Sequence, residues 1–425
     1  MGDDGLQACG VVMEARAPGK VILCGEHAVV HGATAVAAAI GLYTHARIHL
    51  LTGEDNLLVL DLPPFQVHLS WPLSQIQSVL DLSSLHKAYP QDVQSISESW
   101  SAKLKQLTDE QLPADADKGL QAGVVAYLFL HLYILGLQPT KMTVTSELPI
   151  GSGLGSSAAF CVSITGALLA AAQQLDLHRH LGPTEEGDMQ RWLDVDDKDL
   201  DIINRWAFEG EKIIHGRPSG IDNTVSTFGY IVKFRQGQLS RIQTTMPLNM
   251  LLTNTKVGRD TKSLVAGVGA RAQRHPKSMA AIFDAVDSIS EEVVSILQSN
   301  SEESRIEHNI VESKKDGHAQ SELVHNTVSR SVEEIKLEEL VQINQGLLQS
   351  MGVSHPCIDA ICCRTSKHKL QSKLTGAGGG GCVLTLLPHC LKSKAIEEVK
   401  ADLAAEGFEC FQAHIGGKGV QISKK

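Results

Sequence analysis

Alternating apolar and polar positions predict β-strands in both halves of the chain. Residues 141–146 alternate strictly, and the apolar, β-branched runs at 249–255 and 382–387 have the length of buried strands. Residues 228–234 and 419–422 show the same character. Strands are therefore expected from the first third of the sequence to its last residues.

Helical spacing predicts helices between these strands. A run of small apolar residues continues to Ala172, and further on an apolar stripe recurs at the spacing of one helix face: Ile203, Trp206, Ala207, Gly210 and Ile214. A second helical spacing is formed by Val324, Val328, Val332 and Ile335. This mixture predicts an α+β fold rather than one doubly wound parallel sheet.

The length of 425 residues predicts two domains, because one hydrophobic core rarely serves so long a chain. We place the boundary near the strand that begins at 228, which gives domains at 1–229 and 230–425 and a catalytic cleft between them. Residues 299–320 are polar and charged, with too few apolar positions to be buried, and are predicted to form a mobile surface insertion.

Composition and charge exclude several classes of protein. The net charge of −10 repels phosphate backbones and makes nucleic acid an unsuitable partner. The longest apolar stretches, at 123–137 and 161–172, are interrupted or shorter than the roughly 18 residues of a spanning helix, so no membrane association is expected. The acidic N-terminus lacks the pattern of a signal peptide, which predicts a cytosolic location. Nine cysteines without a Cys-x-x-Cys pair indicate neither a disulfide framework nor a zinc site.

A glycine-rich loop at 147–159 gives the strongest chemical signal. It follows the strand predicted at 141–146 and leads into the small-residue helix, so Gly151, Gly153 and Gly155 stand before a helix N-terminus. Backbone amides and the helix dipole at such a position favour a phosphate. A P-loop would carry Gly-Lys-Ser/Thr where Ser156 and Ser157 stand, so this loop is a different phosphate-binding type.

A second glycine-rich segment lies near the C-terminus. Residues 376–381 contain G-x-G-x-x-G, but the segment precedes the strand at 382–387 instead of following a strand and opening a helix. A dinucleotide site is therefore not indicated, and a flexible loop lining an active site is expected. The acidic cluster at 194–201 lacks the glycine and final glutamate of a calcium loop and is interpreted as the solvated start of a helix.

A third segment, residues 15–32, contains a Pro-Gly turn that is expected to project Lys20 outward between strands. Glu26 and His27 follow the next strand, where another turn begins. Taken alone, Lys20 is more often a surface residue and His27 more often a structural one. Because this segment occurs together with two glycine-rich loops, an active-site role is expected for both residues instead.

These three motifs, in this order, resemble the superfamily of galactokinase, homoserine kinase, mevalonate kinase and phosphomevalonate kinase. The similarity to the mevalonate kinases extends over nearly the whole chain except the polar insertion, and includes residues 206–216, 218–223 and 252–257. The resemblance implies a two-domain small-molecule kinase with ATP bound by residues 1–229 and an active site in the cleft between domains. It implies phosphorylation of the primary hydroxyl of mevalonate, with Mg²⁺ as the cation. It also implies a homodimer that prenyl diphosphates inhibit.

The same resemblance assigns roles to individual residues. Asp222 corresponds to a catalytic base and Lys20 to an active-site lysine that can lower the pKa of the attacking hydroxyl. Ser157 and Glu211 correspond to magnesium ligands. The ATP contacts it implies are Lys20, Ser146, Gly151, Ser152, Gly153, Leu154, Gly155, Ser156 and Ser157. The substrate contacts it implies are Glu26, His27, Thr261 and Ala377.

Several alternatives stay open at the level of sequence. Helical periodicity does not separate Glu211 from Glu209, because both flank the apolar stripe equally. Arg259 and Lys262 keep phosphomevalonate or another alcohol as a possible substrate.

A catalytically silent nucleotide-binding regulator is a third interpretation, against which an intact set of base, lysine and cation ligands argues. Residues after His27 offer no acid for sugar hydroxyls, which disfavours galactose. Gly258, Asp260 and Ile150 depart from the family pattern and put substrate affinity in question more than reaction type.

Overall fold

The computed structural model describes residues 12–51, 56–81, 92–149, 151–175, 192–244, 246–299 and 330–424. It divides into two compact units that are not continuous in sequence. Unit 1 comprises residues 1–21, 37–230 and 416–425, and unit 2 comprises 22–36 and 231–415. Most of the insertion expected at 299–320, together with Ile150, Val324 and Val328, lies outside the described residues.

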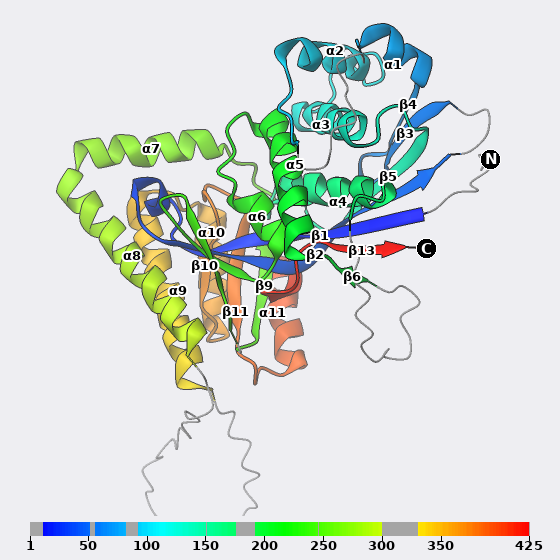
Figure 1. Cartoon of the computed structure of the whole chain (residues 1–425). Coiled ribbons are helices and arrows are strands. Elements are labelled where there is room, and N and C mark those ends of the chain that lie inside the picture. Colours follow the sequence, from blue (N-terminus) through cyan, green and yellow to red (C-terminus); the bar gives the residue numbers. More distant parts are fainter. Residues whose placement is uncertain are drawn as a thin grey trace, which may run out of the picture. The chain divides into compact units, whose positions relative to one another are not determined.

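Unit 1 is built on a mixed sheet (Figure 1). Its strands are β1 (Val12–Cys24, which passes into unit 2 after residue 21), β2 (Ala35–Leu50), β3 (Leu57–Leu62), β4 (Val67–Pro72), β5 (Thr140–Ser146), β6 (Leu193–Asp194) and β13 (Gln421–Lys424). The sheet order is β4-β3-β5-β2-β1-β13-β6, in which β3 and β5 are parallel and β1 is antiparallel to β13. The last strand of the chain therefore completes the sheet that the first strand begins.

The helices of unit 1 pack mainly against one another. They are α1 (Leu73–Val79), α2 (Glu98–Asp109), α3 (Lys118–Leu135), α4 (Ser156–Ala171), α5 (Asp197–His215) and α6 (Ile221–Phe228), with the short 3-10 turn η2 (Pro63–Phe65). The acidic cluster does begin a helix, since the Asp196 side chain caps α5 by accepting from the Asp199 amide.

Helix α3 corrects the expectation that no apolar stretch is long enough to span a membrane. Its 18 residues satisfy that test by length and hydropathy alone. Its apolar residues from Val124 to Ile134 are nevertheless buried inside unit 1, where α3 packs against α2, α4 and α5. A core helix that is apolar on nearly every face explains this composition.

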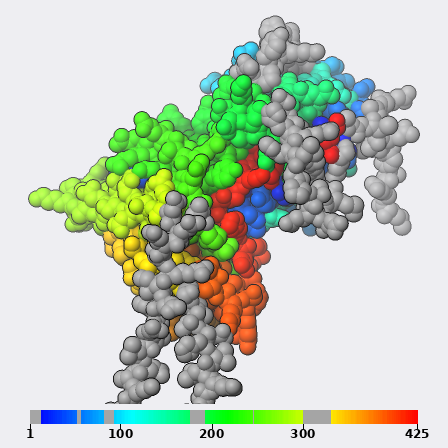
Figure 2. All heavy atoms as spheres, turned by 60° about the horizontal axis from the view of Figure 1, so that its bottom comes forward, coloured from blue at the N-terminus to red at the C-terminus, as the bar shows by residue number. Residues whose placement is uncertain are grey.

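Unit 2 combines a set of antiparallel strands with helices. Its strands are β9 (Leu248–Asn254), β10 (Ser372–Leu374), β11 (Cys382–Leu387) and β12 (Glu409–Ile415) in the order β10-β11-β9-β12, and β7 (Ile231–Arg235) with β8 (Gln238–Ile242) forms a hairpin. Its helices are η1 (Ala28–His31), α7 (Thr261–Arg274), α8 (Pro276–Gln298), α9 (Val332–Met351), α10 (Pro356–Lys367) and α11 (Ser393–Ala405). Helix α7 buries only Val268, and Figure 2 shows the yellow-green corner of α7 and α8 projecting into solvent.

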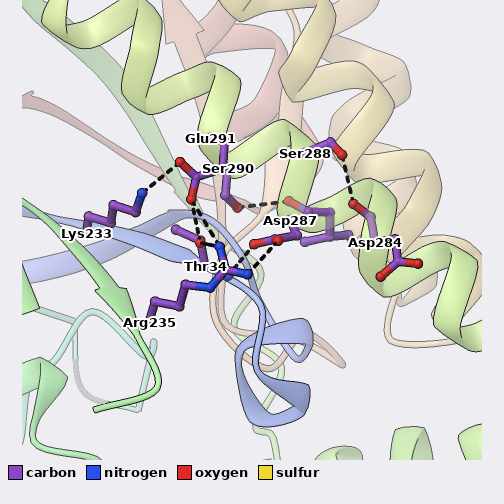
Figure 3. A network of polar contacts seen from close by, with 9 residues as sticks. Thr34, Lys233, Arg235, Asp284, Asp287, Ser288, Ser290 and Glu291 are labelled. Carbon is purple, nitrogen blue, oxygen red and sulfur yellow. Dashed lines mark hydrogen bonds and ion pairs between the residues drawn. The ribbon is translucent and has the colours of Figure 1, made fainter. Parts of the chain in front are cut away.

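A polar network fixes helix α8 to the segment that follows η1 (Figure 3). The Thr34 amide donates to Asp287 Oδ1 at 2.7 Å, and the Thr34 hydroxyl donates to Glu291 Oε1 at 2.8 Å. Two cations of β7 complete the network, because Lys233 Nζ lies 2.7 Å from Glu291 Oε2 and Arg235 Nη2 lies 3.2 Å from Asp287 Oδ2. Both carboxylates are thus paired with a cation and with Thr34, which anchors the end of the segment carrying Glu26.

Most of the predicted elements are confirmed. Strands at 141–146, 249–255 and 382–387 correspond to β5, β9 and β11, and the helix expected to reach Ala172 is α4. The strand expected at 228–234 was placed too early, because Phe228 is the last residue of α6 and β7 begins at Ile231.

Candidate active site

The predicted phosphate loop connects β5 to α4 in unit 1. Gly155 is the N-cap of α4 with a φ of 75°, and a β-carbon there would approach Lys20 Cγ to 2.9 Å. The Lys20 amide donates to the Leu154 carbonyl at 2.7 Å, which holds the loop against β1. Ser152 donates to the Pro149 carbonyl at 2.6 Å, so its hydroxyl shapes the turn. The loop therefore contacts Lys20 directly through its backbone.

Lys20 does not project outward from a turn, which corrects the sequence expectation. Strand β1 continues through the Pro-Gly pair, and Lys20 is only 6% exposed. The extended backbone is fixed from both sides: Ser226 of α6 donates to the Pro18 carbonyl at 2.7 Å, and Gly19 leaves room for the Leu154 carbonyl, which a β-carbon would approach to 2.7 Å. Tertiary contacts thus override the local turn preference of Pro-Gly.

Asp222 lies in the first turn of α6 and not in the loop before it. The glycine before this turn, Gly220, is the N-cap, so Asp222 does not cap the helix. Its Oδ1 is 3.2 Å from Lys20 Nζ, and 36% of its side chain is exposed. Because Ser226 lies one helical turn further along the same face of α6, its bond to Pro18 places Asp222 opposite Lys20.

The two glutamates that periodicity could not separate have different environments. Glu209 is paired with Lys212 at 2.6 Å. Glu211 is 3% exposed, and its Oε1 has no hydrogen-bond partner among the described residues. Burial, followed by the nearby charge of Asp222, raises the pKa of Glu211 to about 7. An uncompensated buried carboxylate is unfavourable unless a cation satisfies it.

His215 was not singled out from the sequence, yet it contacts both predicted metal ligands. Its Nε2 is 2.9 Å from Ser157 Oγ and 4.0 Å from Glu211 Oε1. The available signal was its spacing, because residues four apart on a helix share a face and His215 follows Glu211 by one turn of α5.

Ser157 and Glu211 suit a hard divalent cation, but they are an incomplete set of ligands. In the part of the chain that the structure describes, no group of three or more His, Cys, Asp or Glu side chains is placed to hold a metal. A hydroxyl and one carboxylate match the manner in which Mg²⁺ binds when phosphate oxygens and water supply its other ligands.

The predicted substrate residues Glu26, His27 and Ala377 come together in unit 2. His27 Nε2 lies 2.8 Å from the Ala377 carbonyl, so this nitrogen carries the proton. Burial lowers the pKa of His27, which keeps the ring neutral and leaves Nδ1 as an acceptor. Glu26 Oε1 accepts from Lys373. Over the described ranges, neither His27 Nδ1 nor Glu26 Oε2 has a hydrogen-bond partner, so two buried acceptors stand on adjacent residues.

Thr261, the fourth predicted substrate residue, is exposed at the first position of α7. Asp260, one of the departures from the family pattern, caps this helix by accepting from the amides of Lys262 and Ser263. Arg259 donates to the Thr375 carbonyl at 3.3 Å, which connects the start of α7 to the second glycine-rich segment.

This second segment leads into β11, as expected, and opens no helix. Gly378 has a φ of 75°, and a β-carbon there would come within 2.1 Å of the Val353 carbonyl. The glycine therefore serves a close backbone approach.

A surface cavity of about 460 Å³ adjoins the side of α5 that carries Glu209. The residues lining it are Asp92, Val93, Gln94, Arg205, Phe208 and Glu209. The cavity presents the ring of Phe208 and the charged groups of Arg205 and Glu209, which lie on α5 within two helical turns of Glu211.

Comparisons with known proteins agree with this geometry. Residues 121–185 match the model of the GHMP kinases N terminal domain, and residues 331–409 match that of the GHMP kinases C terminal domain. A mevalonate kinase of Arabidopsis thaliana is 46% identical over 415 residues, covering 96% of this chain and 99% of the relative. A mevalonate kinase of Homo sapiens is 38% identical over 416 residues, covering 97% and 95%.

The fold is also found in a solved structure. The L. major mevalonate kinase in complex with R-mevalonate superposes with a TM-score of 0.61 at 22% identity, covering 95% of this chain and 96% of that one. Identity near 40% over almost the full length of the curated relatives, with both family domains matched, shows that the chain belongs to the mevalonate kinase family of GHMP kinases.

Proposed function

We propose that this protein transfers the γ-phosphoryl group of ATP to the primary hydroxyl of mevalonate, giving 5-phosphomevalonate and ADP. The observation that carries the proposal is the ion pair of Lys20 with Asp222, at 3.2 Å, directly beside a glycine-rich helix N-terminus. Membership of the mevalonate kinase family supports mevalonate as the acceptor.

Asp222 is proposed to act as the general base. In this step the hydroxyl oxygen of mevalonate bonds to the γ-phosphorus, the bond to the β–γ bridging oxygen breaks, ADP leaves, and the hydroxyl proton moves to Asp222. Lys20 orients Asp222 through their ion pair and offsets negative charge that develops on the transferred group. The 36% exposure of Asp222, against the burial of its partner, leaves the carboxylate accessible to substrate.

Mg²⁺ is proposed to bind Ser157 and Glu211. When bound, the cation neutralises phosphate charge and orients the phosphoryl group. The buried, unpartnered Oε1 of Glu211 supports this assignment over Glu209, whose carboxylate is already paired with Lys212. The amides at the start of α4 are proposed to bind the phosphates of ATP, as the resemblance implies for Ser146 and residues 151–157.

Glu26 and His27 are proposed to bind the hydroxyl groups of mevalonate. Both atoms left without a partner in the described structure, Glu26 Oε2 and His27 Nδ1, are acceptors, whereas the carboxylate of mevalonate needs donors. Thr261 at the start of α7 is proposed to contribute such a donor.

Phosphomevalonate is less well supported as a substrate. The curated relatives that match nearly the whole chain are mevalonate kinases, which favours mevalonate over its phosphorylated product as the acceptor. A silent regulator is not supported either, because pure binding gives no reason for a Lys20–Asp222 pair beside an unsatisfied carboxylate.

The test is release of ADP that depends on both magnesium and mevalonate, with phosphomevalonate, homoserine and galactose as parallel substrates. Asp222→Asn is expected to lower kcat by roughly 10²–10⁴ while nucleotide affinity stays nearly unchanged. The matched control is Asp197→Asn, which makes the same change at the first residue of α5. Equal turnover in the Asp222 variant and the wild type would remove the base from the mechanism.

A homodimer, inhibition by prenyl diphosphates and a cytosolic location are further proposals that rest on the family resemblance. A diphosphate would compete with ATP for the amide donors at the start of α4. Competition against ATP, but not against mevalonate, in steady-state kinetics is the expected result. Light scattering after size exclusion measures the oligomeric state.

A further inference from the structure

A lysine is buried completely inside unit 2, away from the phosphate loop. Lys373 occupies the middle of β10, and its side chain is 1% exposed. It lines a small cavity whose other walls are apolar: Leu23, Leu248, Met250, Val293, Leu297, Leu337, Val341, Leu384 and Leu386. An ammonium group in such surroundings is strongly unfavourable unless a nearby carboxylate compensates it.

The compensating group is Glu26. Lys373 Nζ donates to Glu26 Oε1 and, at 2.7 Å, to the Leu374 carbonyl. The Glu26 side chain is 0% exposed, so the ion pair is shielded from water on both sides. One carboxylate oxygen is thereby fixed, and the other, Oε2, keeps its full acceptor capacity in the described structure.

The contact belongs to a set of three that repeats at every second residue. Lys373 contacts Glu26, Thr375 exchanges hydrogen bonds with Ile22 at 2.9 and 3.1 Å, and the Ala377 carbonyl accepts from His27 at 2.8 Å. Lys373 and Thr375 make their contacts through side chains two residues apart, whereas Ala377, in the turn after β10, uses its backbone carbonyl. Strand β10 and the turn that follows it therefore hold the end of β1 and the adjoining Glu26–His27 turn at three points.

We propose that Lys373 is a positioning residue for the substrate: by holding Glu26 Oε1 it fixes Oε2 in the orientation that accepts a substrate hydroxyl. The inference rests on the proposed function, because it assumes that Glu26 binds mevalonate. Lys373 itself does not touch substrate. Its effect is expected on the binding of the alcohol and not on the binding of nucleotide, whose proposed contacts lie in unit 1.

The experiment first establishes turnover of mevalonate by the wild type, since its absence would overturn the proposed function independently of Lys373. Lys373→Met, Lys373→Arg, Glu26→Gln and the double variant Lys373→Met/Glu26→Gln are then compared by calorimetric Kd for mevalonate, Kd for ATP and Tm. Lys400→Met, which removes a surface lysine paired with Glu397 in the same unit, is the matched control.

Lys373→Met is expected to weaken mevalonate binding by about tenfold or more and to change the Kd of ATP by less than about twofold. The double variant removes both buried charges, so it should fold even if Lys373→Met does not. Its mevalonate affinity should match that of Glu26→Gln to within about twofold, because the lysine acts only through the glutamate.

Three results would overturn the proposal. The first is unchanged mevalonate affinity in a folded Lys373→Met or Lys373→Arg protein. The second is an equal loss of affinity for ATP and mevalonate, together with a lowered Tm, which would indicate a structural role. The third is a double variant that binds mevalonate much more weakly than Glu26→Gln, which would show that Lys373 acts by another route.

Discussion

Replacing Glu211 by Gln should stabilise the protein when cation and nucleotide are absent. The pKa of Glu211 is raised from 4.5 to about 7, mainly by burial and secondly by the charge of Asp222. Since one pKa unit corresponds to about 1.4 kcal/mol, the ionised carboxylate costs the folded state up to about 3 kcal/mol at neutral pH. Gln has nearly the same shape and no charge, so the variant should recover most of this free energy of unfolding.

The direction of the Glu211 pKa shift determines how the stability difference between Glu211→Gln and wild type depends on pH. The folded state retains a proton on Glu211 that the unfolded state has lost between pH 4.5 and about 7, so wild-type stability falls as pH rises through this window. The difference between Glu211→Gln and wild type should be near zero at pH 4.5 and reach its maximum above pH 7. Glu209→Gln is the control, and it should give no such gain, because it removes the 2.6 Å ion pair with Lys212.

Urea unfolding with EDTA present, followed by tryptophan fluorescence between pH 4.5 and 8, measures this difference. Trp206 is buried on the same helix and reports on the unfolding of unit 1. A stability difference that stays constant across the pH range, or a variant less stable than wild type at pH 8, would refute the reasoning. The same variant should lose the stabilisation that Mg²⁺ with ATP gives the wild type.

Three further predictions concern a helix cap, an ion-pair network and a buried histidine. Asp260→Ala should raise the KM for mevalonate because α7 loses its cap, whereas Asp260→Asn should leave KM within roughly twofold, since Asn caps equally well; steady-state kinetics measures both. Asp287→Asn should lower Tm and weaken the dependence of Tm on salt, because Arg235 loses one of its two carboxylate partners and keeps Glu291, as a thermal scan at two salt concentrations will show. Burial lowers the pKa of His131 from 6.5 to about 4, so stability should decrease as pH falls from 6.5 to 4, and His131→Gln should flatten that decrease in acid unfolding curves.

The elements that were predictable from sequence are those whose pattern is local. Residues 141–146 and 382–387 alternate or run apolar over the length of one strand, and both are strands in the structure. The proposed phosphate loop was recognisable because glycines before a small-residue helix are a local arrangement as well. The family resemblance then supplied the proposed catalytic pair, Lys20 and Asp222, which are some 200 positions apart in the sequence yet lie 3.2 Å from each other.

The features that sequence could not provide depend on contacts between distant residues. Lys20 is held in the interior by two long-range contacts, one from its own amide to the Leu154 carbonyl and one from Ser226 to the Pro18 carbonyl, which no property of Pro-Gly reveals. Glu211 differs from Glu209 through burial, not through periodicity. Each unit is also built from separate stretches of the sequence. In unit 1, β13 at the C-terminus pairs with β1, so a single boundary in the chain cannot separate the two units.

The charges around the proposed site residues differ between the two units. In unit 2 the carboxylate of Glu26 is balanced by Lys373, so its remaining oxygen can accept from a neutral hydroxyl without any further ion. In unit 1 the ammonium of Lys20 faces Asp222, and the buried Oε1 of Glu211 has no hydrogen-bond partner among the described residues, with His215 Nε2 4.0 Å away. ATP would add more negative charge to this excess of carboxylates. Under the proposed function, the requirement for Mg²⁺ therefore arises from the residues around the phosphates and not from those that hold the alcohol.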